Sequence, residues 1–152
     1  GRRTAAAFGV RGRLVHFEYF RLSRDQEGLG REGDIVGLEV NMRPSGGFTP
    51  DMINYAGSVD IFRLYADMVL HDRVSVPEDR RTYHCVFVGR QDVRAYAHGH
   101  DEVLAAWGHR IMHTDRMPEA LSGAMGNTIY LAKCISLDEV NDFIDYCCKR
   151  LA

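Results

Sequence analysis

The sequence predicts an α+β protein built from two small units, and three observations support this fold class. Two apolar runs with alternating polar residues flank a polar, glycine-containing stretch, which is typical of an antiparallel hairpin. Near the C-terminal end, a serine precedes apolar residues at helical spacing, which predicts an amphipathic helix. A polar, proline-containing segment at residues 72–81 separates these two halves. We therefore place one unit at residues 1–75 and a small α+β lobe at residues 76–152.

The first half is expected to be organised around the hairpin. Residues 13–22 alternate between apolar and polar side chains and predict one strand. The apolar run at residues 35–42 predicts its antiparallel partner. The loop between them, residues 23–34, is long for a hairpin, which indicates a mobile or functional loop.

Helices are expected on both sides of this hairpin. Residues 2–8 are rich in alanine, and Gly9 is a plausible stop signal. Thr49 followed by Pro50 is a strong helix start, because Thr caps the backbone and Pro suits the first helical position. Apolar spacing predicts a further helix at about residues 59–71.

The second half is expected to contain antiparallel strands and two helices. The apolar run Tyr83–Gly89 and residues 128–134 predict two of the strands. The other expected elements are strands at 91–97 and 109–113, a helix at 101–107 ending at Gly108, a glycine turn at 122–126 and a final helix from Ser136 to about Leu151.

Composition limits the classes of function. The 152 residues are 45% hydrophobic and 26% charged, with a net charge of −2, which is ordinary for a globular protein. The chain has no excess of basic residues that would indicate a nucleic-acid partner. No apolar run approaches the roughly 20 residues that span a bilayer. No signal peptide is visible, so we expect a cytoplasmic protein with buried or free thiols. The cysteines are Cys85, Cys134, Cys147 and Cys148.

The strand at residues 35–42 carries the main candidate site. Glu39, Asn41 and Arg43 occupy every second position, so their side chains share a face. Carboxylate and amide oxygens are the ligands that Mg²⁺ prefers, and Arg43 could hold a phosphoryl oxygen bidentately. The alternative is a solvent-facing strand with a surface Glu–Arg pair.

The hairpin gives a second, independent reason to expect a metal. It could bring Glu18 opposite Glu39, and two facing carboxylates repel each other. A bound cation would reverse the sign of that interaction. His16 lies on the same face as Glu18; it is either a neighbour that supports the ligands or a partly buried histidine without a chemical role.

The run Glu39-Val-Asn41-Met-Arg43-Pro-Ser-Gly-Gly resembles the metal-binding strand of the ATP-grasp superfamily. Residues 14–20 resemble that family's preceding strand, which carries its other metal-binding glutamate, here Glu18. The resemblance covers roughly residues 3–71. It implies that these residues form the C-terminal part of an ATP-grasp domain. It also implies that Glu18, Glu39 and Asn41 bind Mg²⁺ or Mn²⁺, that Glu39, Asn41 and Arg43 contact Mg-ATP, and that Arg43 has the catalytic role.

The resemblance further implies an ATP-dependent ligase. A small carboxylate substrate becomes an acyl phosphate, and an amine or another nucleophile then displaces the phosphate. The lysines and glycine-rich loop that grip ATP in such enzymes are not recognisable here, since Lys133 and Lys149 are the only lysines. We therefore expect a C-terminal fragment of a longer enzyme that is inactive alone.

The alternative function is a non-catalytic binding, regulatory or oligomerisation module. An apolar sheet face left exposed on such a module would favour a homodimer. A zinc site at His98 and His100, or at His109 and His113, is disfavoured because no Cys-x-x-Cys or His-Glu-x-x-His pattern supports it.

Overall fold

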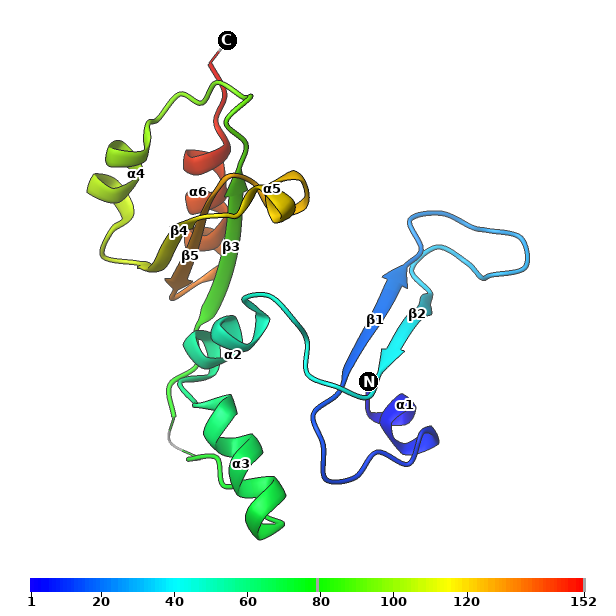
Figure 1. The fold of residues 1–152 in the computed structure, drawn as a ribbon. Helices are drawn as coiled ribbons and strands as arrows, with labels where there is room; N and C mark the ends of the chain where they lie inside the picture. The colour runs from blue at the N-terminus through cyan, green and yellow to red at the C-terminus, as the bar shows by residue number, and fades with distance from the viewer. Residues whose placement is uncertain (79, 152) are drawn as a thin grey trace. The chain divides into compact units, whose positions relative to one another are not determined.

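The protein is described by a computed structural model that places residues 1–78 and 80–151 (Figure 1). The fold is α+β with two small antiparallel sheets. The chain divides into two compact units. Unit 1 comprises Gly1–Pro50 and Ile61–Val76, and unit 2 comprises Asp51–Asp60 and Pro77–Ala152. Residues 51–60, which we assigned to the first unit from the sequence, thus belong to the compact body of the second.

The elements follow one another in a mixed order along the chain. They are α1 (Arg2–Ala7), β1 (His16–Arg21), β2 (Ile35–Asn41), α2 (Thr49–Gly57), α3 (Ile61–His71), β3 (His84–Arg90), α4 (His100–Trp107), β4 (Ile111–Arg116), α5 (Glu119–Met125), β5 (Thr128–Cys134) and α6 (Leu137–Cys148). No helix within residues 1–78 and 80–151 has both the length and the apolar character needed to cross a bilayer.

Unit 1 is organised by the hairpin of β1 and β2, which pair antiparallel as the alternating pattern predicted. Its connecting loop is folded back on itself, since the Leu22 amide donates to the Asp34 carbonyl and the Gly33 amide donates to the Leu22 carbonyl. A further bridge joins Gln26 to Gly30. Leu22 is buried beneath these contacts. The loop is therefore held by its own backbone bonds.

Unit 2 contains a three-stranded sheet in the order β3-β5-β4, with every neighbouring pair antiparallel. The central strand β5 is buried along most of its length because both of its edges are paired. Residues 128–134 form this strand, as predicted. Helix α6 packs on β3 and β5, and α4 contacts α6. Figure 1 shows α6 running along this sheet.

The core of unit 2 lies between α6, α4 and the sheet. Val86, Val103, Tyr130 and Phe143 meet there, each less than a tenth exposed. Ser136 caps α6 by accepting a hydrogen bond from the Glu139 amide at 3.1 Å, which confirms the predicted start of this helix. The sequence pattern therefore located the core-forming elements β3, β5 and α6.

Two predicted elements were wrong. Residues 91–97 do not form a strand; a turn bond from the Arg94 amide to the Gln91 carbonyl bends the chain directly after β3. Residues 122–125 belong to helix α5, and only Gly126, with φ of +91°, is the glycine turn. Gly126 is required there because a Cβ would lie 2.7 Å from the Arg90 amide nitrogen.

Candidate functional site

The hairpin of unit 1 brings four polar side chains onto one face. Glu18 pairs directly with Glu39, and His16 pairs with Asn41 two residues further along the hairpin. Residues two apart on a strand share a face, so the two pairs project together. The predicted opposition of the two glutamates across the hairpin is thereby confirmed.

A bulge follows the carboxylate pair. Register shifts between Glu18 and Tyr19, because Glu18 pairs with Glu39 whereas Tyr19 pairs with Gly37. Leu38 is thus the extra residue on β2. Bulges increase local twist and redirect side chains, and they are common beside functional sites. Here the bulge separates the polar rungs from the apolar remainder of the hairpin.

His16 is held in one orientation by two hydrogen bonds. Its Nδ1 lies 3.2 Å from the Arg43 carbonyl oxygen, and its Nε2 lies 2.9 Å from the Asn41 Nδ2. A carbonyl oxygen only accepts and an amide nitrogen only donates, so Nδ1 carries the proton and Nε2 offers its lone pair. A backbone carbonyl on the far ring nitrogen is the usual arrangement of a metal-binding histidine.

The carboxylates stand close to this imidazole. One ligand atom each from His16, Glu18 and Glu39 lies within 4.8 Å of the other two, and His16 Nε2 is 3.8 Å from Glu39 Oε1. The histidine side chain is 19% exposed and the Glu39 side chain 47% exposed. The donor set of one nitrogen and two carboxylates fits a divalent cation. It is the one such metal-ligand cluster among residues 1–78 and 80–151.

Arg43 is connected to this cluster through its backbone. Its carbonyl accepts from His16, whereas its guanidinium Nη1 donates to the Pro44 carbonyl at 3.2 Å. The Arg43 side chain is exposed. The structure therefore brings Glu18, Glu39 and Asn41 together, adds His16, and leaves the Arg43 guanidinium on the adjoining loop.

Comparisons with protein-family models, with curated proteins and with solved structures found no match. The ATP-grasp resemblance consequently stays a prediction that rests on the motif.

The histidines considered for zinc have other neighbours in unit 2. His98 stacks on Tyr146 with ring centroids 3.9 Å apart, and His100 Nδ1 lies 2.8 Å from the Tyr130 hydroxyl. His109 stacks on Trp107. The described residues around them form no metal-ligand cluster. The structure shows these rings stacking on aromatic side chains and forming one hydrogen bond.

Unit 2 also holds a polar pocket that the sequence reasoning missed. The pocket has a volume of about 430 Å³ and opens between the end of β3 and the segment before α4. Burial raises the pKa of the Tyr130 hydroxyl on its wall. The sequence did contain a signal for this pocket. Arg90 directly follows the apolar run at residues 83–89, and a charged side chain at the end of a buried strand has little access to water.

Proposed function

We propose that this chain carries the metal–nucleotide hairpin of an ATP-dependent ligase of the ATP-grasp type. The observation that carries the proposal is the direct opposition of Glu18 and Glu39, with Asn41 two residues away on the same face of the hairpin. Three oxygen-bearing side chains share one face of the same hairpin that contains the Glu-x-Asn-x-Arg motif. An alternating surface strand alone would not require a second carboxylate on the partner strand.

The side chains have separate roles in this proposal. Glu18, Glu39 and Asn41 hold Mg²⁺ or Mn²⁺, and the ion neutralises the phosphates of ATP when bound. Arg43 leaves the Pro44 carbonyl and donates to the phosphoryl group in transfer. Phosphoryl transfer depends mainly on positioning and charge neutralisation, so no protein nucleophile is needed.

The reaction proposed has two steps. A carboxylate oxygen of the small substrate attacks the γ-phosphorus of ATP, the bond to ADP breaks, and an acyl phosphate forms. An amine or another nucleophile then attacks the acyl carbon, and phosphate leaves. The contribution of this hairpin is to the first step, because its cationic and metal-binding groups match the negative charge of the phosphates.

The His16 imidazole favours some metal ions over others. Imidazole nitrogen is a ligand of transition-metal ions, and carboxylates suit Mn²⁺ among them, whereas Mg²⁺ keeps to oxygen ligands. His16 Nε2 lies 3.8 Å from Glu39 Oε1 and accepts a hydrogen bond from the Asn41 amide. We propose that turning over this amide frees the Nε2 lone pair for a metal and brings the Asn41 oxygen beside it. We therefore propose that this site binds Mn²⁺ more tightly than Mg²⁺.

Calorimetric titration tests the proposal. The longest version of the protein that can be expressed is titrated with MnCl₂ and MgCl₂, each with and without a non-hydrolysable ATP analogue. Glu39→Gln serves as the test variant. Glu27→Gln is the matched control, because it removes the same charge from the exposed hairpin loop of the same unit. We expect saturable metal binding that Glu39→Gln abolishes and Glu27→Gln retains.

The two parts of the proposal fail separately. Equal metal binding by the protein and by Glu39→Gln would overturn the metal site. Metal binding that is unchanged by the ATP analogue, with no metal-dependent binding of the analogue itself, would overturn the ligase assignment.

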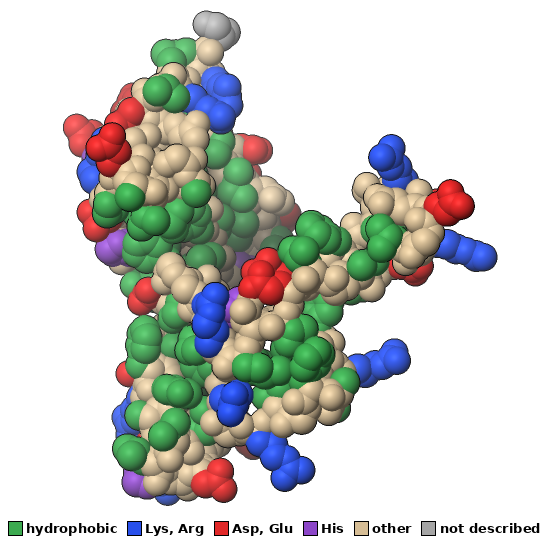
Figure 2. Space-filling model, turned by 45° about the vertical axis from the view of Figure 1, so that its right-hand side comes forward, with side chains coloured by type: hydrophobic (Ala, Val, Ile, Leu, Met, Phe, Trp, Pro, Cys, Tyr) green, Lys and Arg blue, Asp and Glu red, His purple; other side chains and the backbone are tan. Residues whose placement is uncertain are grey.

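A second candidate is a non-catalytic module that binds a second copy of the chain. Apolar side chains on the hairpin favour it, since Phe20, Ile35 and Leu38 are each more than half exposed. Figure 2 shows hydrophobic side chains reaching the molecular surface in this view. Light scattering across a concentration series tests this candidate: a dimer that Phe20→Ser dissociates supports it, and a monomer at every concentration excludes it.

A further inference from the structure

Unit 2 contains a buried arginine with an unsatisfied guanidinium. Arg90, the last residue of β3, is only 8% exposed. Its Nη2 donates to the His98 carbonyl at 2.6 Å, and its Cζ lies 4.1 Å from the centroid of the Tyr96 ring. Its Nη1 is buried and has no hydrogen-bond partner among residues 1–78 and 80–151. In the part of the chain that the structure describes, Arg90 forms no ion pair.

A charge in this position is incompletely compensated. A guanidinium keeps its proton in proteins, so burial cannot neutralise Arg90. The groups that interact with it are all neutral: the His98 carbonyl, the face of the Tyr96 ring and the Tyr130 hydroxyl. Buried charges are otherwise paired with an opposite charge. The Nη1 proton therefore lacks the partner that a negatively charged group would provide.

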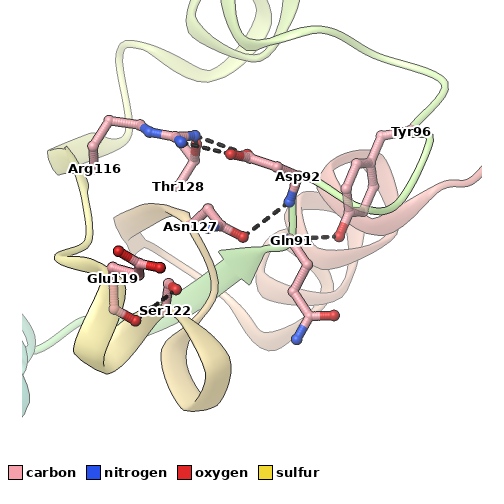
Figure 3. Close-up of polar contacts among 8 residues, drawn as sticks. All are labelled: Gln91, Asp92, Tyr96, Arg116, Glu119, Ser122, Asn127 and Thr128. Carbon is pink, nitrogen blue, oxygen red and sulfur yellow. Dashed lines mark hydrogen bonds and ion pairs between the residues drawn. The ribbon is translucent and has the colours of Figure 1, made fainter.

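The nearby carboxylate is already engaged. Asp92 accepts two hydrogen bonds from Arg116, at 2.8 and 2.5 Å, as Figure 3 shows. This guanidinium lowers the pKa of the Asp92 carboxyl. The Asp92 amide is fixed as well, by the Asn127 side-chain oxygen at 3.0 Å. Asp92 is thus oriented toward Arg116 and forms no ion pair with Arg90.

The surroundings of Arg90 are positively charged and rich in donors. The pocket of about 430 Å³ falls in the range of small-molecule sites. Three arginines but one carboxylate are among the residues that line it. The lining includes the charged side chains of Arg90, Asp92, Arg94 and Arg116, and the polar rings of His100 and Tyr130. The Tyr130 hydroxyl and His100 Nδ1 hydrogen-bond each other on the same wall.

We propose that this pocket binds the oxyanion of a small molecule, a carboxylate or a phosphate, with the unpaired Nη1 of Arg90 as its central donor. An oxyanion there would complete the hydrogen bonds of the guanidinium and balance its charge. Tyr96 holds the guanidinium plane, and it is itself anchored by a bond from the Gln91 amide to its hydroxyl at 3.0 Å. The donor is therefore positioned before the ligand arrives. This site is independent of the proposed ligase function, which rests on unit 1.

Amide and arginine side-chain NMR spectra test the site. The protein is titrated with sodium phosphate, with sodium acetate and with sodium chloride at matched ionic strength. We expect saturable shifts at the Arg90 side chain and at the amides of Gln91 and Gly99. Saturation by phosphate alone, by acetate alone or by both supports the site and identifies the class of oxyanion. Shifts that stay linear, or that chloride reproduces, overturn it.

Two variants strengthen the test. Arg90→Lys keeps the charge but loses the fixed planar donor, and we expect the affinity to fall by about 10-fold to 100-fold. Arg81→Lys is the matched control, because Arg81 lies over Tyr83 outside the pocket. Equal affinity in both variants overturns the role of Arg90. If Arg90→Lys does not fold, the titration of the unchanged protein still decides between the outcomes.

Discussion

Unit 1 and unit 2 hold their charged groups in different surroundings. Glu18 and Glu39 stand on a two-stranded hairpin whose side chains are largely exposed, with Leu22 as its buried apolar residue among those described. Arg90 instead lies at the end of a strand that belongs to a packed sheet. A two-stranded hairpin has little stability of its own in water, whereas a three-stranded sheet covered by helices has a core.

This difference has a consequence for binding. The carboxylates of Glu18 and Glu39 face each other and repel, so the cation that we propose would change the stability of its own site. The Arg90 pocket is fixed by core packing, so its ligand meets donors already in place. We expect the stability of unit 1 to depend more strongly on its ligand than the stability of unit 2, whose core folds around the pocket without a ligand.

The largest expected loss of stability follows a substitution in the core of unit 2. Phe143 is fully buried against Trp107, with ring centroids 5.3 Å apart, whereas Phe20 of the hairpin is 56% exposed. Phe143→Ala should lower the free energy of unfolding by about 3–5 kcal/mol through the lost contacts and the cavity. Phe20→Ala should cost less than about 1 kcal/mol. Trp107 is the single tryptophan, so urea unfolding followed by its fluorescence reports on unit 2, and hydrogen exchange at the amides of residues 16–21 reports on unit 1. Similar losses in both variants would contradict the contrast.

The next effect concerns the carboxylate of Glu139. It accepts from the Ile135 amide at 2.6 Å and from Arg110 Nε at 2.7 Å. The Ile135 amide first, and then Arg110, lower the pKa of this carboxyl below its usual value near 4.5. Because the folded pKa is the lower one, the stabilisation is complete above pH 4.5 and is lost as pH falls through the folded pKa.

Glu139→Gln should therefore cost about 1.5–3 kcal/mol near neutral pH and flatten the acid limb of the stability curve. The control is Glu119→Gln, an exposed carboxylate in the first turn of α5. Urea midpoints measured from neutral pH down to about pH 3.5 check this expectation. An acid limb as steep in Glu139→Gln as in the unchanged protein would refute the assigned role.

A smaller effect with a change of sign is expected in the hairpin. Without metal, Glu18→Gln relieves repulsion from Glu39 and should stabilise unit 1 by a few tenths to about 1 kcal/mol. With saturating Mn²⁺, the same variant loses a ligand and should be the less stable protein. Hydrogen exchange at the amides of residues 16–21 measures this locally. A variant that is stabilised equally in EDTA and in Mn²⁺ would mean that no cation joins the two carboxylates.

The smallest expected effect concerns the reactivity of two neighbouring thiols and not the stability of the protein. Cys148 is exposed, whereas neighbouring Cys147 is buried, and burial raises the pKa of its thiol to about 12. Iodoacetamide at neutral pH should label Cys148 first, because the thiolate is the reactive form. Peptide mass spectrometry distinguishes the two positions. Rapid labelling of Cys147 would show that the core of unit 2 opens readily.

Local patterns were sufficient to predict much of the fold. Alternation along residues 13–22 and 35–42 predicted a hairpin that could bring Glu18 opposite Glu39, and the structure has this pairing; the bulge beside it was not predicted. Ser136 predicted the start of α6, because capping is a contact within four residues. Helix α5 was missed because Ser122 and Gly123 both favour turns, and tertiary context overrode that preference.

Contacts between residues distant in sequence explain the features of the structure that the sequence did not predict. His16 obtains its orientation from the carbonyl of Arg43, which is 27 residues away, so alternation alone could not assign its tautomer. Arg90 becomes a candidate site only when residues 96–98 fold back over it. Residues 91–97 were predicted as a strand because their composition carries no sign of this return.

Manganese-induced broadening in the amide NMR spectrum tests the central claim most directly. Mn²⁺ is paramagnetic, so substoichiometric amounts broaden only the signals near the ion. We predict loss of signals at residues 16–18 and 39–41, their return on adding EDTA, and no such loss in Glu39→Gln. Broadening centred on another acidic surface, or the same broadening in Glu39→Gln, would contradict a metal site on this hairpin.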